Sequence, residues 1–216
     1  MSIRIQQPEA EDRPQMRLLA EPSLARRALL FAATAALSPT LSPAWSAGDD
    51  ATLSAFVDKE FGYQLSYPSS FKLSNKPVKT HLSEAVLKSP LRGVQLGITV
   101  DPVRIASLEQ FGTLEEVTQR VLAVEETRDG VTDVKLRAAS QEAGPPLYYT
   151  IEYRVESTRG KKVYLCKYSI APRPGRSESS LYVLQAQAYL DTFDSESDAE
   201  VRQQLQSAVS SFKVGS

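Results

Sequence analysis

Residues 147–170 read LYYTIEYRVESTRGKKVYLCKYSI and carry the strongest two-residue alternation in the chain. Leu147, Tyr149, Ile151, Tyr153 and Val155 alternate with more polar neighbours, the pattern of a strand that buries one face. After a turn at Ser157–Lys161, the alternation resumes with Tyr164, Cys166, Tyr168 and Ile170 on one face. Gly160 supplies the positive φ that a short connection needs. The stretch therefore predicts a long antiparallel hairpin.

Further strands are predicted on both sides of this hairpin. They are expected at Phe61–Pro68, Ala85–Lys88, Val94–Val100, Val134–Ala139 and Leu181–Leu190. Lys72 to Ser83 reads as a surface loop, because it is rich in lysine and contains Pro77.

Two amphipathic helices are predicted. Thr113 and Glu116 form a capping box before a helix at 114–126, and its buried stripe is expected to be Leu114, Val117, Val121 and Val124. The acidic run 194–200 is expected to open a last helix with a second capping box at Ser197 and Glu200, its acids complementing the helix dipole. The buried stripe of that helix is Val201, Leu205, Ala208, Val209 and Phe212.

Strands joined by turns and covered by two helices predict an α+β fold, an antiparallel β-sheet flanked by helices. We expect this domain to span residues 48–216. Residues 1–47 predict a cleaved targeting region instead. Arg26 and Arg27 precede ten residues without charge, and small residues near Ser46 suit a cleavage site, as in a twin-arginine signal. Ten apolar residues are too short to span a bilayer.

Composition and motifs exclude several functional classes. The formal net charge of −1 does not favour a nucleic-acid partner, and a single cysteine excludes an intrachain disulfide. No phosphate-binding loop, metal-binding helix or nucleophile elbow is present, so we expect no catalysis. Cys166 is expected to be a small buried hydrophobe and His81 an exposed loop residue.

Basic residues at the two ends of the second hairpin strand are the candidate interaction sites. Arg159, Lys161 and Lys162 lie in its turn, and Arg173 and Arg176 lie in the loop that follows it. A strand of this length separates the two groups by about 30 to 40 Å, so they cannot form one anion pocket. Each could dock separately on an acidic partner, or could serve only to keep a hairpin end soluble.

Five short motifs together resemble the PsbP family of extrinsic thylakoid-lumen proteins over about residues 56–214. They are Phe61-Gly62-Tyr63 with Tyr67-Pro68; Leu108 to Val117 around Phe111-Gly112-Thr113; Tyr148-Tyr149 with Glu152-Tyr153; Leu181-Tyr182-Val183-Leu184; and Ser211-Phe212-Lys213-Val214. Each motif is individually weak, but their order and spacing are specific.

The resemblance implies an α/β/α sandwich and a location in the chloroplast thylakoid lumen, peripheral to the membrane. It also implies a non-catalytic role at the lumenal face of a photosynthetic complex, foremost the oxygen-evolving side of photosystem II. An assembly or docking factor for photosystem I or the NDH complex is the first alternative, and a lumenal enzyme or small-ligand binder is the second. The family has an association with calcium, but no metal ligand can be carried over, and we expect no required cofactor.

Overall fold

The predicted hairpin is present as β7 (Tyr148–Ser157) and β8 (Gly160–Pro172) in the computed structural model, which describes residues 52–74 and 80–215. The other strands are β1 (Leu53–Asp58), β2 (Tyr63–Pro68), β3 (Lys72–Leu73), β4 (Ser83–Lys88), β5 (Gln95–Pro102), β6 (Val131–Glu142), β9 (Ser179–Tyr189) and β10 (Lys213–Val214). The helices are α1 (Leu108–Phe111), α2 (Leu114–Glu126), α3 (Leu190–Asp194) and α4 (Ala199–Ser211).

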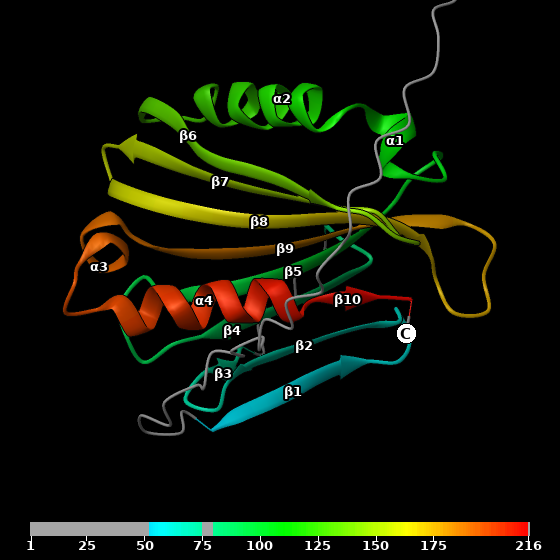
Figure 1. The fold of residues 1–216 in the computed structure, drawn as a ribbon, viewed down its shortest axis with the longest axis horizontal. Helices are drawn as coiled ribbons and strands as arrows, with labels where there is room; N and C mark the ends of the chain where they lie inside the picture. Colours follow the sequence, from blue (N-terminus) through cyan, green and yellow to red (C-terminus); the bar gives the residue numbers. More distant parts are fainter. Residues whose placement is uncertain (1–51, 75–79, 216) are drawn as a thin grey trace, which may run out of the picture. The chain divides into compact units, whose positions relative to one another are not determined.

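The strands form two antiparallel sheets, which confirms the α+β class but not the single sheet that was expected. The larger sheet has seven strands in the order β3-β4-β5-β9-β8-β7-β6, and the smaller has the order β1-β2-β10 (Figure 1). The smaller sheet joins segments about 150 residues apart, because Lys213 pairs with Gln64. Turn signals cannot reveal such a long-range pairing.

The hairpin is buried on both faces, whereas the alternation predicted burial on one. The expected face packs under α1 and α2, with Ile151, Tyr153 and Cys166 in that core. The opposite face was expected to be polar, yet Tyr148 and Val163 belong to the core shared with α4 and the small sheet. Strands buried on both faces lie in the middle of a sandwich, and β8 is one of them.

Helix α2 begins at its predicted cap, but its predicted stripe is only partly confirmed: Val117 is buried, Leu114 and Val121 are half-buried, and Thr118 is buried although it was not predicted. The Thr113 hydroxyl accepts from the Glu116 amide, and the Glu116 carboxylate accepts from the Thr113 amide. Val124 was expected to be buried but is 59% exposed, and Glu125 is buried instead. Glu125 faces inward because its carboxylate accepts from the Tyr153 hydroxyl at 3.2 Å.

The last helix buries its predicted stripe, but its predicted cap is wrong. Helix α4 starts at Ala199 after Asp198, and no side chain caps it. The Ser197 hydroxyl bonds that of Ser195, and Glu200 accepts from Gln204. The acidic run is also divided between two helices, because Asp194 ends the short helix α3 and pairs with an arginine of β6.

Two predictions lie wholly or partly outside the described residues. The targeting region 1–47, with Arg26 and Arg27, is one of them, and part of the predicted loop at 72–83 is the other. Of the helices that the structure describes, none has the length and apolar character to cross a membrane.

Candidate functional site

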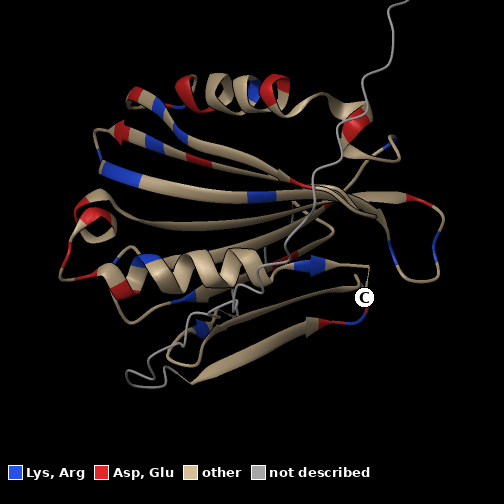
Figure 2. Cartoon of the chain, in the orientation of Figure 1, with Lys and Arg blue, Asp and Glu red and all other residues tan. Residues whose placement is uncertain are grey.

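Basic side chains gather around one tyrosine at the turn end of the β7–β8 hairpin. The Lys162 ammonium lies 5.7 Å and the Arg92 guanidinium 6.0 Å from the centre of the Tyr189 ring. Arg159 shares with Arg92 and Tyr189 a surface hollow of about 480 Å3, which Leu91, Thr192 and Asp198 also line. We call Arg92, Arg159, Lys162 and Tyr189 the Tyr189 patch. Figure 2 shows the basic residues at this end of β8.

Two glycines allow the Tyr189 ring to sit at this position. Gly93, in the β4–β5 turn, has φ 81°, and a Cβ there would lie 2.4 Å from the ring. Gly160, in the hairpin turn, has φ 110° and lies on the other side of the ring, where a Cβ would be at 3.6 Å. A side chain at position 93 would therefore displace the ring. Strand β9 lies between β5 and β8 in the sheet. The turns that precede β5 and β8 therefore lie on the two sides of Tyr189, at the end of β9.

The structure divides the five basic residues that the sequence singled out. Arg159 and Lys162 join the Tyr189 patch, while Lys161 pairs with Glu156 at 3.1 Å. Arg173 and Arg176 follow the far end of β8, and the Arg173 guanidinium stacks on Phe61 at 5.7 Å. The two groups lie at opposite ends of one strand, so they do not form one site.

Sequence reasoning missed Arg92, although it belongs to the same patch. Arg92 lies 67 positions before Arg159 in the chain. The pairing of β5 with β9 brings the turn that carries Arg92 next to Tyr189. The strands Ala85–Lys88 and Val94–Val100 on either side of that turn were predicted, but nothing local indicates that the turn between them lies beside the hairpin turn.

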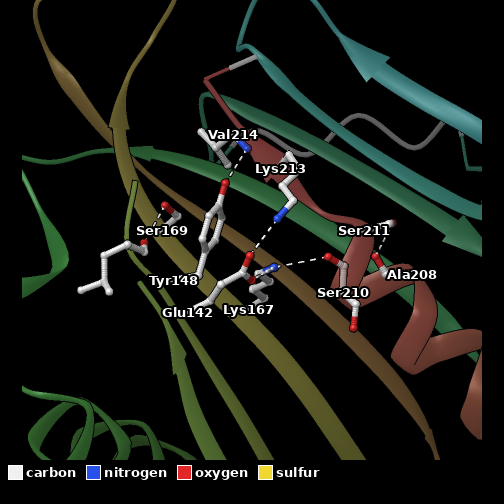
Figure 3. A network of polar contacts seen from close by, with 10 residues as sticks. Glu142, Tyr148, Lys167, Ser169, Ala208, Ser210, Ser211, Lys213 and Val214 are labelled. Atoms are coloured by element: carbon white, nitrogen blue, oxygen red, sulfur yellow. Dashed lines mark hydrogen bonds and ion pairs between the residues drawn. The ribbon is translucent and has the colours of Figure 1, made fainter. Parts of the chain in front are cut away.

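A second site lies between α4 and the face of β6, β7 and β8 that α4 only partly covers. Its centre is Lys167, a lysine that is only 1% exposed (Figure 3). The ammonium donates to the Glu142 carboxylate at 2.9 Å and to the Ser210 carbonyl at 3.4 Å, and lies 4.4 Å from the centre of the Tyr148 ring. Two hydrogen bonds and one aromatic ring therefore stabilise this buried charge.

The same network fastens the end of the chain to the sheet. Lys213 donates to the other oxygen of Glu142 at 2.8 Å, and the Val214 amide donates to the Tyr148 hydroxyl at 2.9 Å. Hydrogen bonds from Lys213 and Lys167 lower the pKa of the Glu142 carboxyl below its ordinary value, while burial raises the pKa of Tyr148. The network thus joins β6, β7 and β8 to α4 and β10.

Acid is expected to weaken this network. Because the folded pKa of Glu142 is lowered, its contribution to stability is complete above the ordinary carboxyl pKa of about 4.3 and is lost as the pH falls through the folded value. Urea unfolding between pH 6 and pH 3 should show stability falling below about pH 4.5. A Glu142→Gln variant should show a shallower fall, whereas parallel curves would contradict this role.

Cys166 and His81 each contact another side chain of the protein, Tyr153 and Asp101 respectively. Cys166 is buried as predicted, its Sγ lies 3.8 Å from the Tyr153 hydroxyl, and burial raises the pKa of its thiol to about 12. The thiolate is therefore scarce at neutral pH. His81 is half-buried, not exposed as expected, because its Nδ1 lies 2.8 Å from the Asp101 carboxylate.

Within residues 52–74 and 80–215, no three His, Cys, Asp or Glu side chains are grouped to hold a metal ion. We therefore assign no residue to calcium.

Comparisons with known proteins agree over most of this chain. The family model described as PsbP matches residues 51–214. PsbP domain-containing protein 2, chloroplastic, from Arabidopsis thaliana is 27% identical over 163 residues, which are 74% of this chain and 66% of the relative, just under two thirds of its length. The solution structure of cyanobacterial PsbP (CyanoP) from Synechocystis sp. PCC 6803 matches with a TM-score of 0.59 and 21% identity, over 80% of this chain and 99% of its own.

A more distant match is the Ran-binding protein Mog1p of Saccharomyces cerevisiae, with a TM-score of 0.45 and 10% identity over 76% of this chain and 95% of its own. A similarity at that level carries no functional argument.

Proposed function

Because this chain belongs to the PsbP family, we propose that it is a non-catalytic extrinsic protein of the thylakoid lumen, which docks against the lumenal face of a photosynthetic membrane complex. The observation that carries the proposal is the family match over residues 51–214, nearly all of the described part. The chloroplast relative and the twin-arginine pattern at Arg26 and Arg27 support the location. No cofactor is required by this proposal.

Photosystem II is the partner complex that we propose first. Photosystem I or the NDH complex is the alternative, since the curated relative is a PsbP-domain protein whose printed name specifies no complex. A native gel distinguishes these hypotheses, because it shows with which complex the protein comigrates.

The Tyr189 patch is the docking surface that this proposal favours. Arg92, Arg159 and Lys162 make no ion pair within the described residues, so their charges are available to a partner. Tyr189 adds a flat apolar surface between them, and arginine with tyrosine is the composition enriched at interface centres. An acidic, partly apolar segment of the partner is the matching surface. Salt screens contacts of this kind.

Charge reversal within the Tyr189 patch is expected to loosen the protein from thylakoids. In Arg92→Glu/Arg159→Glu/Lys162→Glu, each attraction becomes a repulsion, so binding should weaken at least about tenfold. Tagged full-length chains would be expressed in plants, and release would be followed through washes of rising salt. The variant should leave the membrane at lower salt than the wild type.

The control is Lys72→Glu/Lys88→Glu, which reverses two exposed lysines outside the Tyr189 patch that are paired across β3 and β4. It should be released at the same salt concentration as the wild type. If all three proteins are released together, the Tyr189 patch is not the docking surface. If the wild type is already soluble at low salt, the extrinsic role itself fails.

A further inference from the structure

Strand β6 forms an open edge of the seven-stranded sheet. Among the residues that the structure describes, it pairs with β7 alone, and every residue from Lys135 to Glu142 is exposed. An edge strand presents a row of unpaired amides and carbonyls that can pair with another chain.

The second half of this edge carries few of the features that usually block strand addition, and the charge of Glu142, its one ionised side chain, is paired with Lys167 and Lys213. Natural edges are protected by lysine, proline or bulges. Strand β6 has irregularities between Val131 and Asp133 and between Leu136 and Ala138, but from Ala138 to Glu142 its register with β7 is regular. That segment reads AASQE, with three small residues and neither lysine nor proline. An approaching backbone therefore meets little steric obstruction there.

A groove of about 480 Å3 borders this edge on the side of α4. Ala138, Ser140 and Glu142 line it from β6, and the residues opposite them on β7 include Thr150 and Glu152. Helix α4 forms one wall of the groove, and β6, β7 and β8 form the other. The remaining lining residues are Gln141, Leu165, Lys167, Gln206, Val209 and Ser210.

The charges of the groove are already paired within the protein. Glu142 binds Lys167 and Lys213, and Glu152 lies 2.8 Å from the guanidinium of Arg137. A charged group entering the groove would lose hydration without gaining a free partner. Hydroxyl and amide side chains, by contrast, meet the hydroxyls of Ser140 and Thr150 and the amide of Gln206.

We propose that residues 138–142 of β6 accept an extended segment of a partner protein as an added strand, whose groove-facing positions carry uncharged polar side chains. Only an extended backbone offers donors and acceptors at the spacing of the open edge. Alternate side chains of the added strand enter the groove, because side chains of a strand alternate between its faces. This edge lies at the opposite end of the strands from the Tyr189 patch. A partner could therefore add a strand here whether or not the Tyr189 patch is a docking surface.

The direct test is peptide binding followed by NMR on the full chain. The probe is a peptide of four Thr-Val repeats flanked by lysine pairs, and its matched control has glutamate in place of threonine. Amide shifts are expected across 138–142, and slowed hydrogen exchange is expected at the alternate amides there that do not bond β7, with affinity at least about tenfold weaker for the glutamate peptide. Lack of protection at 138–142 with millimolar peptide would overturn the proposal, and so would equal binding of both peptides.

Two substitutions distinguish this edge from any other exposed strand. Ala138→Lys places a charge at the groove and Ala139→Lys places one on the opposite face, and each is expected to reduce binding at least about tenfold. The control Ala55→Lys alters another exposed alanine, on β1 of the small sheet, and should bind normally. Equal loss in the control would overturn the proposal. Protection of the outward-facing amides of 138–142 without peptide, together with a dimer mass that rises with concentration, would make a second copy the occupant and also overturn the proposal.

Discussion

Replacing Phe212 by alanine is expected to lower the free energy of unfolding by about 3 to 5 kcal/mol. Phe212 is 0% exposed, and the centre of its ring lies 6.1 Å from that of Tyr63 in β2. It follows the last residue of α4 and precedes β10, so it packs where the helix, the large sheet and the small sheet meet. A cavity enclosed by three elements cannot collapse easily. The loss of stability should therefore lie near the upper end of the range for truncating a core side chain.

The matched control is Phe111→Ala. Phe111 is 40% exposed at the end of α1, so the same chemical change should cost no more than about 1 kcal/mol. Urea unfolding followed by circular dichroism gives both values. Similar losses in the two variants would show that Phe212 is not the packing centre inferred from its burial.

The second large effect is expected at Glu142, although its side chain is half exposed. Glu142→Ala removes the carboxylate that Lys167 contacts at 2.9 Å and leaves a buried ammonium with one carbonyl at 3.4 Å and an aromatic ring. A buried charge that loses its partner is strongly destabilising. Water can enter where the exposed carboxylate was, so we expect a loss of about 2 to 3 kcal/mol.

Substitution of the lysine itself should be milder. Lys167→Met keeps most of the buried side-chain volume and leaves Glu142 with Lys213 and solvent, so a loss of about 1 kcal/mol or less is expected. The double variant Glu142→Ala/Lys167→Met should recover most of the stability lost in Glu142→Ala. Urea unfolding at pH 7 measures all three. If the double variant is as unstable as the sum of its parts, the two residues are not coupled as described.

Local signals predicted the parts of this fold that depend on neighbours in the chain. The Thr113 cap requires only Glu116 three residues later, and both hydrogen bonds form. The same reasoning failed at Ser197, because the short helix α3 changes how the chain enters α4. Val124 was misplaced because helical periodicity cannot anticipate that Tyr153 draws Glu125 into the core.

The candidate sites were less predictable than the elements that carry them. Arg159 and Lys162 were recognised as basic and near a turn, yet Arg92 comes from the turn between β4 and β5, and Tyr189 comes from the end of β9. The burial of Lys167 contradicts the ordinary preference of lysine for solvent, and only the packing of β8 between two layers explains it.

The amino-acid sequence by itself determined the hairpin, the N-terminus of α2, the buried stripe of α4 and the family, because each rests on residue types at fixed spacing. The tertiary structure alone decided that β10 pairs with β2, that β8 is buried on both faces, that two glycine turns hold Tyr189 among basic residues, and that β6 remains an open edge. The physical reason is that local periodicity is set by backbone geometry within a few residues. Which strands meet, by contrast, depends on loop closure and packing across the whole chain.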